Sequence, residues 1–323
     1  MEVRGRLRRL LVGAVVVGAT GIAAPTIGAT TAPAAPAASP AAPAPARATT
    51  AATSYDAAGT PEHRVQRRDK CGPVLRKPSG RRWRCSFVDN FGKKELDRSR
   101  WIIQHTAKTG FKTGRTCYRD SPDNIAQRDG ALVLTARKGR WINCRFGPRW
   151  LRTKFTGGMI GTKGKFSQKY GRFEVRMKFP EHQTGGVHGG FWMFPVEATY
   201  GPWPHSGEID VAEWWSYDHT LVLPSLHFEG RDPDVDSGWD CRVEDPDVFH
   251  TYTLVWQRAR MQFLIDGTAC FTTTWEPDHP LRAPQPFDHR FSMILNVGVQ
   301  DQGLSARTTF PAELLVDYAK AWR

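Results

Sequence analysis

Three carboxylates fall within six positions of residues 207–215, which read GEIDVAEWW. The apolar residues between them favour a strand over a solvated acidic loop. Side chains alternate along a strand, so Glu208 and Asp210 share a face, whereas Glu213 at an odd spacing would point away. A one-residue bulge at Val211-Ala212 would return Glu213 to that face, and bulges recur beside active sites. We therefore predict a bulged strand that presents all three carboxylates to one side.

Paired carboxylates of this kind suit the hydrolysis of a glycosidic bond, which uses one ionised carboxylate and one protonated carboxylic acid. Mutual repulsion opposes ionisation of all three, so one should keep its proton near neutral pH. We assign Glu208 as nucleophile, Asp210 as the partner that orients it, and Glu213 as general acid and then general base. A chance acidic strand or a cation site is the alternative, but the aromatic residues around the stretch suit neither.

The stretch EIDVAE resembles the E-x-D-x-x-E signature of glycoside hydrolase family 16, in the bulged form typical of laminarinase-like enzymes. The resemblance implies an all-β fold, a concanavalin A-like β-jelly-roll sandwich of two antiparallel sheets with a concave substrate cleft. It also implies a retaining mechanism. Further blocks match in the family's order over about residues 85–323, namely 87–91, 130–137, 165–174, 191–193, 203–204, 249–252, 291–296 and 315–318.

Four more residues are candidates for substrate binding. By resemblance, Trp203 lines the subsites next to the scissile bond, His227 lies beside the nucleophile, and Asn296 lies near the cleft. Strand alternation adds Trp215, which should face the cleft if Glu213 does, while Trp214 points into the core. For Trp203 and His227, an ordinary structural role is the alternative.

The resemblance also suggests a metal position. Asp317 and the backbone at Gly130 are similar to a calcium site that some family members carry on the convex face. One carboxylate is a small ligand set, and such an ion would be structural. Catalysis by this mechanism requires no cofactor.

The first 60 residues differ in composition from the rest. Residues 1–9 hold four arginines and one Glu, and residues 10–24 are rich in Gly, Ala and Val, which predicts an export signal over residues 1–24. A membrane anchor is the alternative, but about 15 residues are short for a bilayer span. Residues 25–60, mostly Ala, Pro and Thr, predict a disordered linker. The catalytic domain is then residues 61–323, secreted and open to association with the cell envelope.

Strand signals dominate that domain. Residues 172–179 alternate polar and apolar side chains, residues 251–256 and 261–265 form a second pair, and Asp266-Gly267 predicts a tight turn into residues 269–273. No long stretch has helical periodicity. Many short strands with Gly- and Pro-rich turns indicate a sandwich or barrel.

Six cysteines all lie in the domain, and an even number in an exported chain suggests disulfides. Six cysteines allow fifteen connectivities. Proximity in sequence favours Cys71 with Cys85, Cys117 with Cys144, and Cys241 with Cys270. A zinc site is the alternative, but no Cys-x-x-Cys pair supports it.

Three regions depart from the laminarinase pattern, which places glucan specificity in question. Residues 185–190 read GGVHGG where those enzymes usually carry Trp-Pro-Ala, residues 89–91 read Asp-Asn-Phe in place of Asp-Glu-Phe, and the long loop 229–248 has no predicted position.

The formal charge is +13, of which residues 1–60 contribute +3 and the remainder +10. That balance would favour approach to anionic polymers or envelopes, but a solvated basic surface is the preferred interpretation, and no nucleic-acid motif is present.

The sequence therefore predicts a secreted, monomeric, retaining endo-glycosidase that hydrolyses β-1,3-glucan. Its partner is a polysaccharide, without nucleic acid and without stable membrane insertion after removal of the signal. One alternative keeps the fold but acts on β-galactans such as agar, carrageenan or β-1,3-galactan, or transfers the sugar instead of hydrolysing. The other is a glucan-binding protein without activity.

Overall fold

The computed structural model describes residues 68–181 and 183–323. The predicted export signal and linker lie outside the described residues, which all fall within the predicted catalytic domain. The described part is almost entirely β-structure, with one four-residue α-helix and one three-residue 3-10 helix. No helix among these residues is long and apolar enough to cross a bilayer.

Short and long strands follow one another along the chain, interrupted by the two helical turns. In chain order the elements are β1 (Arg68–Asp69), β2 (Gly72–Pro73), β3 (Cys85–Asp89), β4 (Ile102–Ile103), α1 (Thr106–Thr109), β5 (Thr116–Tyr118), β6 (Ile125–Arg128), β7 (Ala131–Phe146), β8 (Arg149–Gly161), β9 (Gly171–Lys178), β10 (Val187–Pro195), β11 (Glu208–Trp215), η1 (Ser216–Asp218), β12 (Val222–His227), β13 (His250–Trp256), β14 (Met261–Ile265), β15 (Thr268–Thr273), β16 (Phe291–Val299) and β17 (Ala312–Trp322).

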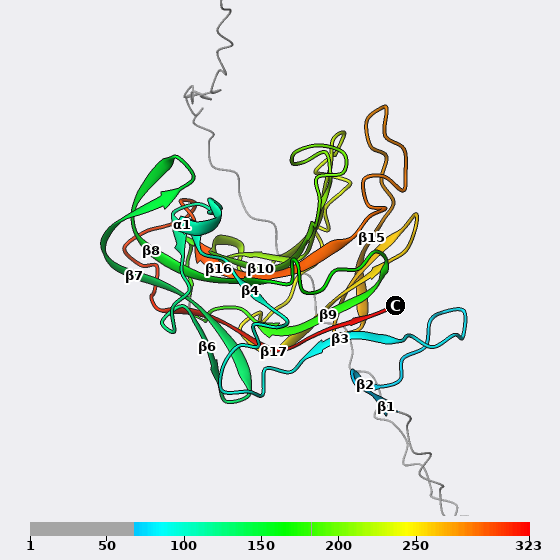
Figure 1. Cartoon of the computed structure of the whole chain (residues 1–323), viewed down its shortest axis with the longest axis horizontal. Helices are drawn as coiled ribbons and strands as arrows, with labels where there is room; N and C mark the ends of the chain where they lie inside the picture. Colours follow the sequence, from blue (N-terminus) through cyan, green and yellow to red (C-terminus); the bar gives the residue numbers. More distant parts are fainter. Residues whose placement is uncertain (1–67, 182) are drawn as a thin grey trace, which may run out of the picture. The chain divides into compact units, whose positions relative to one another are not determined.

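Apart from β1 and β2, which form a separate two-stranded sheet, these strands form two layers (Figure 1). The cleft sheet has the order β12-β11-β10-β16-β8, and the back sheet has the order β7-β17-β9-β13-β14-β15, with β3 and β6 at its side. The long strands β7 and β8 pair with each other and connect the two layers. Almost all pairings are antiparallel; β5 with β8 is parallel. The predicted sandwich of two antiparallel sheets is confirmed.

The space between the sheets is filled by apolar side chains. Ile209 and Leu295 of the cleft sheet and Phe173, Val175 and Leu314 of the back sheet are all fully buried. Along β9 the buried positions alternate with partly exposed ones as its sequence pattern predicts, except at Glu174, which is also buried. The hairpin of β13 and β14 and the turn into β15 also lie where the sequence places them.

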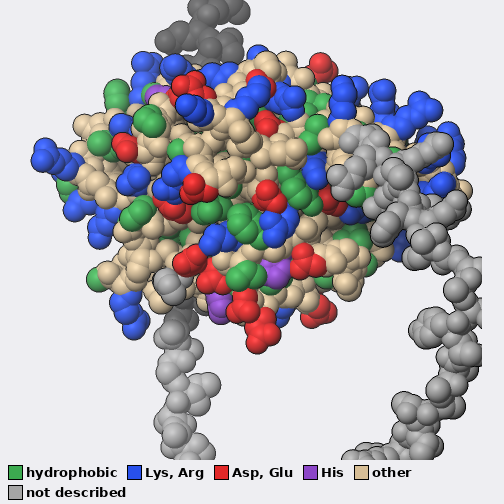
Figure 2. All heavy atoms as spheres, turned by 90° about the horizontal axis from the view of Figure 1, so that it is seen from below, with side chains coloured by type: hydrophobic (Ala, Val, Ile, Leu, Met, Phe, Trp, Pro, Cys, Tyr) green, Lys and Arg blue, Asp and Glu red, His purple; other side chains and the backbone are tan. Residues whose placement is uncertain are grey.

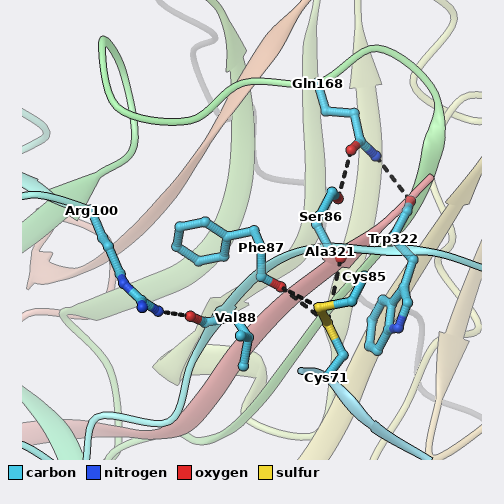
Figure 3. The surroundings of a disulfide bond; sticks show 9 residues. All are labelled: Cys71, Cys85, Ser86, Phe87, Val88, Arg100, Gln168, Ala321 and Trp322. Carbon is cyan, nitrogen blue, oxygen red and sulfur yellow. Dashed lines mark hydrogen bonds between the residues drawn. A yellow bond between two sulfur atoms is a disulfide. The ribbon is translucent and has the colours of Figure 1, made fainter. Parts of the chain in front are cut away.

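Three disulfides join Cys71 to Cys85, Cys117 to Cys144, and Cys241 to Cys270, which confirms the predicted pairing. Figure 3 shows the first, where the segment before β3 is attached beside the end of β17. Gln168 strengthens this corner, because its side chain accepts from Ser86 and donates to the carbonyl of Trp322.

The loop 229–248, which the sequence leaves unplaced, runs along the outer edge of β12. The backbone N–H of Leu226 donates to Asp236, that of Gly238 donates to Pro224, and that of Val222 donates to Cys241. The disulfide from Cys241 to Cys270 attaches the loop to β15. The loop therefore covers an edge strand that would otherwise offer free backbone groups.

Candidate active site

The acidic strand β11 carries the predicted bulge. Asp210 pairs with Ser225 of β12 and Glu213 with Leu223, so β11 has one residue more than its partner over this interval. Toward β10 the register also shifts, and Val211 has no partner there. All three carboxylates consequently line one cavity, as the sequence predicts.

Each carboxylate has its own polar neighbour on a different segment. The indole N–H of Trp203 donates to Glu208 Oε2 at 2.5 Å. His227 Nε2 lies 2.8 Å from Asp210 Oδ2, so this histidine contacts the middle carboxylate although its backbone pairs with Glu208. Glu213 Oε1 lies 3.1 Å from a histidine nitrogen of β10. These contacts fix the direction of three side chains that repel one another.

The cavity has a volume of about 450 Å³, and six Phe and Trp residues contribute to its walls. Trp203 and Trp215 line it, whereas Trp214 is buried and stacks on Phe179, so the predicted alternation of the two tryptophans is correct. A second cavity of about 210 Å³ adjoins it and shares three of its wall residues, Phe111, Trp192 and Phe194. The site is therefore an elongated groove on the cleft sheet.

Asn296 also lines the cavity, but its side chain is already engaged. Its Oδ1 accepts from Trp192 Nε1 at 2.8 Å, and its Nδ2 donates to the hydroxyl of Tyr118 at 3.1 Å. The amide therefore anchors Trp192 in the wall of the groove. A direct contact between Asn296 and substrate stays a prediction.

The His188 side chain is the site residue that the sequence did not single out. It is the donor candidate opposite Glu213, it is buried, and its ring lies 4.2 Å from the ring of Trp215. Its Nδ1 is buried and has no hydrogen-bond partner among the described residues. A proton on Nδ1 would leave a buried donor unsatisfied, so we assign the neutral ring with its N–H at Nε2, donating to Glu213.

The three carboxyl groups divide their protons unevenly. Burial, followed by the nearby charge of Asp210, raises the pKa of Glu208 to about 8. Burial and the charge of Glu213 raise the pKa of Asp210 well above its ordinary value. Burial also acts to raise the pKa of Glu213, but the hydrogen bond from His188 leads the effects that outweigh it, and the pKa is lowered. In the free site Glu213 is therefore the ionised member.

In the predicted calcium position, Asp317 is paired with an arginine. Asp317 Oδ2 lies 2.7 Å from Arg176, so a metal ion would have to displace this guanidinium. Within residues 68–181 and 183–323, no group of three or more His, Cys, Asp or Glu side chains is arranged to hold a metal. The calcium position at Gly130 and Asp317 stays a prediction.

Comparisons of the chain with a protein-family model and with known proteins agree with one another. Residues 115–318 match the model of "Glycosyl hydrolases family 16". A glucan endo-1,3-beta-glucosidase of Cryptopygus antarcticus is 30% identical over 261 residues, 74% of this chain and 92% of that protein. Glucan endo-1,3-beta-glucosidase A1 of Niallia circulans is 30% identical over 259 residues, which are 73% of this chain but only 37% of that protein.

A solved structure gives the same result for the fold. The laminarinase from Rhodothermus marinus superposes with a TM-score of 0.61 at 27% identity, covering 75% of this chain and 97% of that one. With the family match, this similarity joins the three-carboxylate strand to an established class of catalysts. The chain belongs to glycosyl hydrolase family 16 and is a glycoside hydrolase.

Proposed function

We propose that the protein is a secreted, retaining endo-β-1,3-glucanase that hydrolyses laminarin-like glucan by double displacement. The observation that carries the proposal is the bulge of β11, which brings Glu208, Asp210 and Glu213 to one face of an aromatic groove. The 30% identical relatives named as glucan endo-1,3-beta-glucosidases support the substrate class.

In the first step, Glu208 attacks the anomeric carbon while Glu213 donates a proton to the glycosidic oxygen, which leaves with the departing sugar. In the second step, Glu213 takes a proton from water, whose oxygen attacks the same carbon and releases Glu208. Trp203 holds one oxygen of the nucleophile by its N–H, and Asp210 lies between the two working groups. His227 orients Asp210.

The proposed reaction requires Glu213 to be protonated and Glu208 to be ionised. In the free site the raised pKa values favour protonated Glu208 and Asp210, and the lowered pKa favours ionised Glu213. The productive form is therefore a minor arrangement of the same protons, and the pH dependence belongs to the set of coupled groups. Because the pKa of Glu208 is about 8, we expect the alkaline limb of kcat/KM near that pH.

The walls of the catalytic cavity favour a neutral polymer at the reacting bond, whereas the adjoining cavity carries one cation, Lys163. Among the described residues lining the catalytic cavity, there is no Lys or Arg, while aromatic rings are abundant. Sugar C–H faces pack on such rings, and an anionic sugar would find no cation there. The two adjoining cavities give a groove that can hold a chain on both sides of the bond, which suits internal cleavage. A neutral glucan thus fits better than a sulfated galactan at the reacting bond.

The test is a reducing-end assay of the full chain on laminarin, mixed-linkage β-glucan, β-1,3-galactan, agarose and carrageenan. Glu208→Gln removes the nucleophilic charge without changing shape and should abolish release of reducing ends. Glu197→Gln is the matched control, because it makes the same change at an exposed position that does not line the groove. Laminarin left intact by the unaltered chain, or cleaved equally by Glu208→Gln, would contradict the proposal.

Two further measurements examine mechanism and export. Proton NMR of the first product should show the β-anomer before mutarotation, since two displacements retain configuration. Formation of longer oligosaccharides would instead indicate transfer. For export, sequencing of protein recovered from the medium should find a start near residue 25, the end of the predicted signal.

A further inference from the structure

The outer half of the β7–β8 hairpin, residues 137–154, is a ribbon that we call the basic arm. It holds seven Lys and Arg residues and no Asp or Glu. The absence of acidic residues extends over residues 130–173. In Figure 1 the two strands of the arm project from the side of the sandwich. A charge run on a solvated loop would be unremarkable, but this one is built on paired strands, which fixes the direction of each side chain.

The two faces of the basic arm differ. One face is attached to the domain through the disulfide from Cys144 to Cys117 and through Phe146, whose ring lies 5.4 Å from Lys112 Nζ. The cross-strand pairs Asn143 with Arg152 and Arg145 with Trp150 belong to the opposite face. That outer face consists of Trp141, Asn143, Arg145, Trp150, Arg152 and Lys154.

The two tryptophans of this face are unusually exposed, Trp141 at 53% and Trp150 at 65%. Arg152 lies 5.1 Å and Lys154 Nζ 4.9 Å from the centre of the Trp141 ring. The ring thus holds two cations in place by cation–π attraction, which limits their freedom before any ligand arrives. A single exposed tryptophan is ordinary. Two exposed tryptophans on one disulfide-anchored hairpin, beside cations held in place, are typical of a binding surface.

The Lys and Arg residues of the basic arm also lack the carboxylate partners that other exposed arginines of the described chain have. Exposed Arg98, Arg128 and Arg242 each form an ion pair with a carboxylate. Within the described part of the chain, no cation of the basic arm does so. Figure 2 shows that charge is unevenly distributed, with Lys and Arg gathered toward the upper and side edges of the face drawn there and Asp, Glu and His toward its lower edge. The arm's positive charge is left available for an external anion.

We propose that the outer face of the basic arm binds a polysaccharide whose sugars carry carboxylate or sulfate groups, at a site separate from the catalytic groove. Sugar rings would pack on Trp150, and the anionic groups would pair with Arg145, Arg152 and Lys154. The arm's disulfide joins it to β5, and the segment just before β5 contributes Phe111 and Thr113 to the groove. A chain held on the arm would therefore keep the enzyme in a matrix where acidic polymer and glucan occur together, raising the effective glucan concentration.

A lipid surface fits the same residues less well. Insertion of Trp141 into a bilayer would carry its two attached cations out of water, at high cost. Single-stranded nucleic acid could also stack on Trp150. The choice of glycan follows from the neighbouring polysaccharide groove, and nucleic acid is an outcome that the experiment can return.

The experiment measures affinity of the full chain by calorimetry for polygalacturonate, dextran sulfate, laminarin, polyphosphate and single-stranded DNA at fixed salt. We expect binding to polygalacturonate or to dextran sulfate. The polymer that binds more tightly identifies the preferred anionic group as carboxylate or sulfate. Both Trp141→Ala/Trp150→Ala and Arg145→Gln/Arg152→Gln/Lys154→Gln should weaken that binding at least about tenfold. Cleavage of a short glucan oligosaccharide should be unchanged in both variants, which separates this proposal from the proposed activity.

The matched control is Arg81→Gln/Arg82→Gln/Arg84→Gln, which removes the same net charge from exposed positions elsewhere. It should keep the affinity for the acidic polysaccharide. Equal losses in the two charge variants would show attraction by net charge alone and would overturn the proposal. An unchanged affinity in the tryptophan variant, or tighter binding of polyphosphate or DNA than of either glycan, would overturn it as well.

Discussion

At the scale of single residues, the reactive carboxylates are held at a cost to the fold. Glu208 has an ordinary pKa of 4.5 when solvated and about 8 in the folded site. Folding therefore disfavours its ionised form, and this loss of stability begins above pH 4.5 and is complete above about pH 8. Sites that keep such groups commonly gain stability when they are neutralised.

Glu208→Gln should consequently raise the free energy of unfolding by on the order of 2 kcal/mol near pH 7.5 and change it little near pH 4. The reason is that glutamine has no charge to desolvate. Thermal unfolding followed at both pH values measures the difference. A variant that is less stable at pH 7.5 than at pH 4, relative to the unaltered chain, would show that Glu208 is not held against its charge.

His188 gives a second test at this scale, because it acts on the reaction through Glu213. Replacing it by Phe removes the N–H that stabilises the ionised carboxylate, so the pKa of Glu213 should rise. The acid limb of kcat/KM should then move to higher pH, while His188→Gln, which keeps an N–H donor, should restore part of the original profile. An acid limb at the same pH in both variants would assign His188 a packing role only.

The groups that face Glu213 come from three strands, so the profile is not set by His188 alone. Asp210 lies on the same strand, and His227 on β12 contacts Asp210. Residue types and parity predict which carboxylates and tryptophans share a face, since both depend on neighbours in sequence. They do not predict the contact of His188 with Glu213, because it depends on how β10 pairs with β11. The sequence did offer one signal: positions 188 and 192 are four residues apart on a strand, so His188 shares a face with Trp192, and both line the cavity.

At the scale of elements, the bulge needs room on its neighbour. Gly190 of β10 pairs with Glu213, and a Cβ added there would lie 2.8 Å from the carbonyl oxygen of Ala212. That oxygen belongs to the backbone, so β11 would have to move. The glycine-rich run of β10, which departs from the family pattern, therefore accommodates the acidic strand closely.

Gly190→Ala should lower kcat by about 10- to 100-fold, because displacement of Glu213 by a fraction of an ångström disturbs the reacting geometry. The same substitution should lower the free energy of unfolding by about 1–3 kcal/mol. Gly92→Ala is the control, since its added Cβ meets nothing within 4 Å. Unchanged kcat with laminarin in Gly190→Ala would mean that β11 tolerates the shift.

The loop 229–248 illustrates what pattern reading leaves out. Its position comes from backbone hydrogen bonds to the edge of β12 and from the disulfide to β15. Such hydrogen bonds carry no signature of residue type. The sequence did predict the pairing of Cys241 with Cys270, yet the partner strand of the loop was not deducible from it.

At the scale of the whole molecule, β17 holds the back sheet together. It lies between β7 and β9 and pairs with β3 as well. Val316 and Leu314 at its centre are fully buried. Its burial pattern is predictable from the sequence, but its central place in the sheet is not, because that place depends on strands far apart along the chain.

A chain shortened after Pro311, which lacks β17, should show no cooperative thermal unfolding transition. Two halves of the back sheet would have no common strand, and the core between the layers would be open to water. Circular dichroism and calorimetry measure this. A shortened chain that melts cooperatively would show that β7 and β9 can pair without β17.

The central place of β17 also sets an order of events during synthesis. The ribosome makes β7 and β9 long before β17, and until then each of these strands lacks its neighbour on one side. The growing chain exposes two unfinished sheet edges throughout that interval, and such edges pair readily with other chains. The time between synthesis of β9 and synthesis of β17 is therefore the interval in which we expect the growing chain to be most exposed to aggregation.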